Sequence, residues 1–426
     1  MKAVQKYSEL DLSKLLTKSY GEDALLENRV RDIITKVKKE GDQALGELTA
    51  QFDGVDYRQR GFKVTAEEIE HAYQEVDEQF LLAIRRAAEN IRQYHEKQQR
   101  VSWLESKEDG TILGQIIRPL KRVGIYVPGG TAAYPSSVLM NALPAVVAGV
   151  EEIAMVTPPR KDGTLLPEVL VAAAECKVQE IYKIGGAQAI AALAYGTETI
   201  APVDKITGPG NIYVTLAKKQ VYGTVDIDML AGPSEILILA DESGNPRELA
   251  ADLLSQAEHD RLASAILVSP SLQLLEKTLR EVERQLKTLP RGEIAAASWE
   301  TYGAAILVQD IQEGIDLANK IAPEHFELVV KEPFSWLGKV KNAGAVFLGG
   351  NTPEPVGDYF AGPNHVLPTG GTARFSSVLD VDAFLKKISV LSYSPEALQR
   401  DAEDIICLAR REGLEAHARA IEVRKR

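Results

Sequence analysis

The feature that most constrains the fold is an alternation of short β-branched runs and Ala-rich helical segments that begins after Gly110. Strands that alternate with helices in this way are typical of parallel sheets in α/β proteins. The expected strands are 122–127, 152–157, 180–184, 204–207, 236–240, 263–268, 304–308 and 345–348. So many strands indicate two α/β units; a duplication would explain them, although no convincing residue-level repeat is visible.

Helical patterns lie within and on both sides of this region. Between the strands, helices are expected at 186–195, 214–219 and 247–258. From Glu22 to about Gln99, apolar residues recur at helical spacing among Glu, Lys and Arg, so this segment is predicted to be mostly helical. Past Phe375 the pattern predicts helices over 381–388 and 395–423, which we interpret as a helical cap or dimerisation element.

Composition narrows the class of protein. A chain of 426 residues with 45% hydrophobic side chains is long enough for two or more domains. The formal net charge of -12 disfavours nucleic-acid binding, which needs clustered Lys and Arg. The first 23 residues lack the apolar core of a secretory signal, and the most apolar stretch, 137–150, is too short to span a membrane. We expect a cytoplasmic protein that binds neither nucleic acid nor membrane.

Two glycine-containing loops follow expected strands. Residues 208–213, Gly-Pro-Gly-Asn-Ile-Tyr, approach the dinucleotide fingerprint G-x-G-x-x-G but lack its third glycine. Residues 127–130, Val-Pro-Gly-Gly, have the same status. Spacing alone leaves two interpretations open, a tight turn or a close approach of the backbone to a ligand.

Four of the six histidines, His259, His325, His365 and His417, lie among polar, Gly or Pro residues, which suggests a shared site. The other two, His71 and His95, lie in the charged helical region and are expected at the surface. Gln256 and His259 are three residues apart at a helix end and could hold one metal ion; alternatively, His259 interacts with the helix dipole.

Two further segments carry acid–base side chains. In 322–328, Pro323 fixes a turn before Glu324 and His325, a pair suited to proton transfer near neutral pH. The loop 352–369 carries Glu354, Asp358 and His365 among prolines and glycines, and long ordered loops are usually functional. By spacing alone Glu412 and His417 look like an ordinary solvated helix face. The pattern therefore indicates a mixed nitrogen and oxygen metal site without naming a substrate.

Taken together, these segments closely resemble the histidinol dehydrogenase family over essentially the whole chain. The resemblance rests on 122–130, 185–190, 208–211, 231–235 and the four histidine segments. The departures are small: Phe326 stands where Leu is more usual, and Pro355-Val356 where a Ser-containing pair is common. Neither departure replaces a metal ligand or a proton carrier.

The resemblance implies an α/β fold with two incomplete Rossmann-like parallel-sheet domains and helical dimerisation elements at both ends. The implied divisions are an N-terminal arm (1–21), a metal and catalytic domain (22–128 plus 236–378), an NAD-contacting domain (129–235) and a C-terminal helical element (379–426). It also implies a homodimer in which the C-terminal part reaches over the partner's site, so that Glu412 and His417 act in trans.

The resemblance further implies the site residues. One zinc per subunit is held by Gln256, His259, Asp358 and His417, and Glu324 and His325 are the catalytic pair. NAD contacts Tyr126, Gln188 and Asn211. The substrate contacts the zinc ligands and also Ser234, His325, Glu354, His365 and Glu412.

The implied activity is oxidation of L-histidinol through L-histidinaldehyde to L-histidine with two NAD, the last step of histidine biosynthesis. His325 is the expected base for the alcohol step, and Glu324 is expected to activate water for the aldehyde step. Neither Cys176 nor Cys407 lies in a candidate site, so covalent catalysis through a thiol is rejected. Two alternatives are a zinc hydrolase with Glu324 as base and a non-catalytic metal-binding α/β scaffold.

Overall fold

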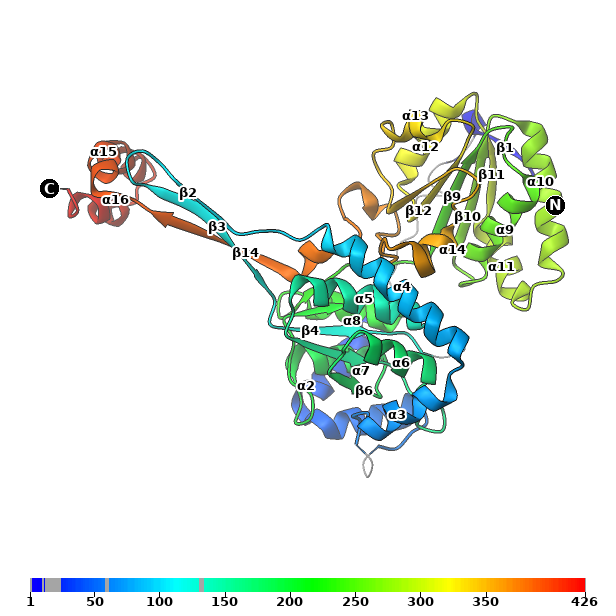
Figure 1. The fold of residues 1–426 in the computed structure, drawn as a ribbon, viewed down its shortest axis with the longest axis horizontal. Coiled ribbons are helices and arrows are strands. Elements are labelled where there is room, and N and C mark those ends of the chain that lie inside the picture. The colour runs from blue at the N-terminus through cyan, green and yellow to red at the C-terminus, as the bar shows by residue number, and fades with distance from the viewer. Residues whose placement is uncertain (1, 10, 12–23, 58–60, 130–133, 426) are drawn as a thin grey trace.

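The computed structural model describes residues 2–9, 11, 24–57, 61–129 and 134–425. Two parallel sheets with their helices form the body of the molecule, and a three-stranded antiparallel sheet projects from it as an arm (Figure 1). Within these ranges, no helix combines the length and the apolar character that a membrane span needs.

The five-stranded sheet has the order β6-β5-β4-β7-β8, and all its strands are parallel. The strands are β4 (Arg122–Tyr126), β5 (Glu152–Val156), β6 (Glu180–Tyr182), β7 (Lys205–Thr207) and β8 (Asp226–Ile227). Its connecting helices are α5 (Pro135–Ala148), α6 (Pro167–Glu175), α7 (Gly186–Tyr195) and α8 (Ile212–Val221).

The six-stranded sheet has the order β1-β11-β10-β9-β12-β13 and is also parallel. The strands are β1 (Gln5–Lys6), β9 (Glu235–Ala240), β10 (Ser264–Ser269), β11 (Ala304–Leu307), β12 (His325–Val329) and β13 (Ala345–Leu348). Its helices are α9 (Pro246–Ala257), α10 (Leu272–Leu286), α11 (Gly292–Tyr302), α12 (Ile311–Ile321) and α13 (Pro333–Leu337).

Both sheets are covered on two faces, which explains the continuous apolar runs in their central strands. In β9, Ile236 and Ile238 join one core cluster, while Leu237 and Leu239 join another, because successive strand residues point to opposite faces. With β1 set aside as an added edge strand, each sheet has the same order: the first of its five strands (β4 or β9) lies in the centre, the second and third on one side, and the fourth and fifth on the other. The two α/β units therefore share one topology.

The boundary expected between the two units is corrected by the packing of the N-terminal helices. β4 pairs with β5 and β7, so 122–126 belong to the five-stranded sheet and not with 236–378. The helices α2 (Ala24–Phe52), α3 (Ala66–Glu75) and α4 (Glu78–Glu96) pack on α7 and α8, on α6 and on α5 respectively. The apolar face of α2 shares a core cluster with Ile190 and Leu193 of α7.

In the expected N-terminal arm, β1 extends the six-stranded sheet, and residues 1, 10 and 12–21 lie outside the described residues.

In the arm, the prediction of a helix over 381–388 is wrong for residues 385–388. They open β14 (Leu385–Ser392), which pairs antiparallel with β3 (Ile112–Pro119), and β3 pairs with β2 (Trp103–Ser106). The partner strand lies more than 250 residues earlier in the chain, and β14 is largely exposed, so it carries no alternating burial pattern. Two helices follow at the end of the arm, α15 (Pro395–Arg411) and α16 (Glu415–Glu422) (Figure 1).

Candidate active site

Glu324 and His325 lie at the amino end of β12, which runs between β9 and the edge strand β13 of the six-stranded sheet. α12 ends at Ile321, and Ala322 then adopts a left-handed conformation (φ 52°) before Pro323 leads into the strand. His325 pairs in register with Ile236 of β9 and Ala345 of β13. Glu324 is 7% exposed and His325 is 3% exposed. Ligands of open parallel sheets usually bind at the carboxyl ends of strands, so this pair occupies the opposite edge.

The backbone of Glu235 orients both side chains. Its N–H donates to Glu324 Oε2 at 2.8 Å, and its carbonyl oxygen lies 3.0 Å from His325 Nδ1. Because that carbonyl can only accept, Nδ1 carries the hydrogen and Nε2 is left for chemistry. Glu324 Oε2 lies 3.7 Å from His325 Nδ1, so the two adjacent side chains converge.

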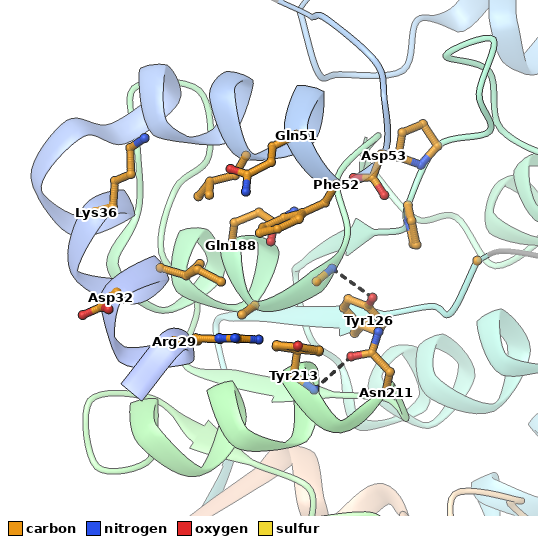
Figure 2. A pocket seen from close by; sticks show the side chains of 17 residues that line it. Arg29, Asp32, Lys36, Gln51, Phe52, Asp53, Tyr126, Gln188, Asn211 and Tyr213 are labelled. Carbon is orange, nitrogen blue, oxygen red and sulfur yellow. Dashed lines mark hydrogen bonds between the residues drawn. The ribbon is translucent and has the colours of Figure 1, made fainter. Parts of the chain in front are cut away.

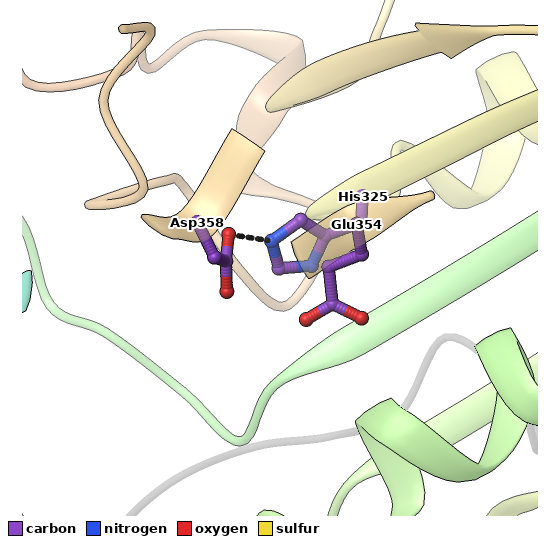
Figure 3. Close-up of side chains that lie close together, drawn as sticks. All are labelled: His325, Glu354 and Asp358. Carbon is purple, nitrogen blue, oxygen red and sulfur yellow. Dashed lines mark ion pairs between the residues drawn. The ribbon is translucent and has the colours of Figure 1, made fainter. Parts of the chain in front are cut away.

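Glu354 and Asp358 complete what we call the His325 cluster (Glu324, His325, Glu354 and Asp358). The loop expected at 352–369 contains short helical turns, α14 (Glu354–Val356) and a π-helical turn η2 (Gly357–Ala361). Glu354 N–H donates to Glu327 Oε1 at 2.8 Å, and Ser255 donates to Glu354 Oε2 at 3.2 Å. Asp358 Oδ1 lies 3.5 Å from His325 Nε2 (Figure 3).

The cluster concentrates acidic groups in a buried place. Burial raises the pKa of Glu324 to about 8 and that of Glu354 to about 7. Burial works against a charged imidazole, yet the carboxylates of Glu354, Glu324 and Asp358 raise the pKa of His325 well above its usual value. Donor atoms of His325, Glu354 and Asp358 lie within 4.8 Å of one another, so a cation would be well stabilised here.

Gln256 supplies an independent sign of a ligand next to this cluster. Its side chain is fully buried at the end of α9, and neither its amide oxygen nor its nitrogen has a hydrogen-bond partner among the described residues. A buried unpaired amide is costly unless something outside the chain satisfies it. The preceding residue, Ser255, contacts Glu354, so the end of α9 that carries Gln256 lies at the cluster.

His259 follows α9 and faces the same region. Its side chain is exposed, yet the surrounding protein still desolvates the ring and lowers the pKa of His259, while Asp358 acts to raise it. His365 and His325 also interact electrostatically with it. Nitrogen and oxygen donors of this kind suit a divalent ion such as zinc, so Gln256, His259 and Asp358 have the donor chemistry of a metal site.

Two more of the expected substrate residues lie near the cluster. His365 is half-buried, and its Nδ1 lies 3.1 Å from the backbone oxygen of Asp358. Ser234 precedes Glu235 at the amino end of β9, and its carbonyl accepts from Ser264 N–H at 3.0 Å.

Glu412 and His417 are not brought to the cluster within one chain. They are exposed at the end of the arm, where they line a groove of about 620 Å³ together with Leu408 and Ile421. Figure 1 places α15 and α16 far along the arm from α14.

The three residues expected to contact NAD meet at the carboxyl edge of the five-stranded sheet. Tyr126, Gln188 and Asn211 all line a cavity of about 810 Å³, which we call the α2–α7 cavity (Figure 2). The Tyr126 hydroxyl accepts from Gly186 N–H at 3.1 Å, and Asn211 caps α8 by accepting from the N–H groups of Tyr213 and Val214. The first turns of α7 and α8 thus border the cavity, an arrangement that favours anions.

No local signal in the sequence predicts the other wall of this cavity. Arg29, Asp32, Lys36 and Asp53 of the α2 region line it, and only the tertiary packing of α2 on α7 brings them there.

His95 is fully buried, so the expectation that it lies at the surface is wrong. Its Nδ1 contacts Ile91 O at 2.8 Å, and Asn364 lies against its Nε2, so it is a structural residue of α4, whereas His71 is exposed as expected.

Comparisons with known proteins agree over nearly the whole chain. The family model described as histidinol dehydrogenase matches residues 16–425. Histidinol dehydrogenase from Moorella thermoacetica is 63% identical over 93% of this chain and 94% of that protein, and the one from Bacillus subtilis is 60% identical over 93% and 92%. A crystal structure of histidinol dehydrogenase from Elizabethkingia anophelis covers 99% of this chain and 98% of its own, with 38% identity and a TM-score of 0.93.

Proposed function

The chain belongs to the histidinol dehydrogenase family, and on that premise we propose that its His325 cluster oxidises L-histidinol through L-histidinaldehyde to L-histidine. The reaction is that of an NAD-dependent oxidoreductase of histidine biosynthesis. The observation that carries the residue assignment is the convergence of Glu324 and His325 on the backbone of Glu235, beside the unpaired amide of Gln256.

In the alcohol step, His325 Nε2 takes the hydroxyl proton while a hydride leaves the carbinol carbon for NAD. Nδ1 stays bonded to the Glu235 carbonyl, so the ring keeps its orientation as Nε2 gains the proton. In the aldehyde step, Glu324 takes a proton from water as the water oxygen adds to the carbonyl carbon. The resulting hydrate anion then transfers its hydride to a second NAD, and the carboxylic acid is released.

We assign the metal ligands to Gln256, His259 and Asp358 of one chain and to His417 of the partner subunit. Zinc bound there would hold the imidazole and amino nitrogens of the substrate and so fix its position. Ser234, Glu354, His365 and the partner's Glu412 would contact the remaining polar groups of the substrate. His325 also lies near Asp358, but its backbone-anchored Nδ1 and its contact with Glu324 suit the role of proton acceptor better.

The role of Glu412 and His417 requires a homodimer. The arm exposes Trp103, Leu104, Leu391 and Leu408, and exposed apolar side chains grouped on an extension mark an interaction surface. The groove between α15 and α16 is mostly apolar, with Glu412 and His417 as its polar groups. Docking of this end onto the His325 cluster of a second copy would supply both residues.

We expect the purified protein to form two NADH for every histidinol consumed, with histidine as the product. Removing zinc with a chelator should abolish the absorbance increase at 340 nm, and adding zinc back should restore it. A zinc-loaded protein that consumes histidinol without NADH would favour the hydrolase alternative. A protein that leaves histidinol unchanged would favour the non-catalytic scaffold.

A further inference from the structure

Asp53 places a carboxylate in the α2–α7 cavity without giving it a visible task. It follows the last residue of α2 and lines the cavity with Tyr126 and Pro158 (Figure 2). Its backbone N–H donates to Thr49 O at 2.8 Å, which extends the helix without using the side chain. Oδ2 is buried and finds no hydrogen-bond partner in the part of the chain that the structure describes.

A buried carboxylate oxygen normally accepts hydrogen bonds, because its desolvation is otherwise uncompensated. Burial raises the pKa of Asp53 to about 6, so the group is still mostly ionised at neutral pH. An ionised oxygen that faces a cavity calls for a donor from the ligand. Hydroxyl groups are the donors that a dinucleotide offers on its riboses.

The other charged groups of the cavity indicate where each part of a bound dinucleotide would lie. Arg29, Asp32 and Lys36 line the cavity from the first half of α2, where Asp32 is exposed, and the first turns of α7 and α8 border it. The two cations and the helix N-termini suit a diphosphate, whereas the buried Asp53 repels one. α2 also packs on α7 and α8, on the side of the five-stranded domain away from α14 (Figure 1). Because the nicotinamide must reach the His325 cluster, the adenosine end belongs on the α2 side.

We propose that Asp53 accepts hydrogen bonds from the 2′,3′-diol of the adenosine ribose and, by its charge, excludes a 2′-phosphate. Asp53 thereby selects NAD over NADP, the task that an acidic residue after the second strand performs in Rossmann domains. Here the carboxylate comes from a helix outside the sheet. The inference rests on the proposed binding of NAD in the α2–α7 cavity.

The test is Asp53→Asn, which keeps the size of the side chain and removes the charge. Steady-state kinetics with NAD and NADP at saturating histidinol, and NADH and NADPH binding by fluorescence, are measured on the zinc-loaded enzyme. We expect KM for NAD to rise about tenfold, kcat to stay within about twofold, and the NAD over NADP ratio of kcat/KM to fall at least tenfold. Asp56→Asn is the matched control, since it removes the same charge three residues away, outside the cavity lining.

Equal changes for NAD and NADP, or unchanged constants for both, would overturn the inference. The binding measurement keeps it separate from the proposed reaction. If wild type forms NADH from histidinol but Asp53→Asn keeps its preference for NADH over NADPH, only the role of Asp53 is wrong. If wild type binds NADH without oxidising histidinol, the reaction is wrong, while the NADH over NADPH preference still decides the role of Asp53.

Discussion

Glu324→Gln is expected to slow the oxidation of histidinaldehyde by about 10²- to 10⁴-fold, while the first turnover from histidinol changes far less. The two half-reactions need different proton chemistry at one place. The alcohol step needs a base on a hydroxyl, for which His325 Nε2 is available, whereas the aldehyde step needs an activated water. Gln keeps the shape of Glu324 and can still accept a hydrogen bond from Glu235 N–H. A lower rate of aldehyde oxidation is therefore due to the missing base.

The measurement compares single-turnover NADH formation from histidinol with NADH formation from histidinaldehyde in the same preparation. His325→Gln is the matched control, because it should slow the alcohol step, which Glu324→Gln changes far less. Equal losses in both steps of Glu324→Gln would mean that Glu324 positions the substrate or supports His325, and the division of labour would be wrong.

His417→Ala is expected to lower bound zinc from about one per chain to less than about a tenth after dialysis, with the α/β fold intact. The residue is exposed at the end of the arm, so truncating it removes no core packing. Far-UV circular dichroism and metal analysis of the same sample give the two readouts.

The structure offers a control for this assignment. His325 shares the donor group with Glu354 and Asp358, so a competing zinc site would use His325 instead of His417. Our assignment predicts that His325→Gln keeps its zinc while losing activity. Zinc retained in His417→Ala and lost in His325→Gln would replace our ligand set with the competing one.

The parallel sheets were predictable because their signal is local. Strands buried on both faces read as apolar runs, and some helices between them stop before a glycine, as α5 and α7 do. The predicted bounds of α7, from Gly186 to Tyr195, agree with the structure. The same holds for the turn at Pro323, which allowed Glu324 and His325 to converge although they are adjacent.

What escaped prediction depends on distant contacts. β14 forms on β3 across the chain, and the adjacent Lys386 and Lys387 are both exposed on it, so no alternation of apolar and polar residues marks a strand there. His95 is buried by Asn364, a residue of a remote loop. Asp53 enters the α2–α7 cavity only through the packing of α2. No window of local sequence contains these contacts.

In the candidate site, too, local sequence signals identified some features, and only the fold revealed the others. Asp358 and His325 were singled out from local composition, and the fold brings them within 3.5 Å. Gln256 was recognised by its spacing from His259, while its unpaired amide is visible only in the structure. The placement of Glu412 and His417 in a partner's site stays a prediction, since within one chain both residues lie far from the His325 cluster.

Subunit mixing tests most directly whether the active site is built from two chains. Inactive Glu324→Ala and inactive His417→Ala chains are mixed in equal amounts, exchanged under conditions that label transfer shows to be effective, and assayed for NADH formation from histidinol. If His417 acts in trans, each mixed dimer has one intact site, so random exchange predicts about a quarter of wild-type activity. If complete exchange restores no activity, both residues serve a site within one chain, and the account of a shared active site is contradicted.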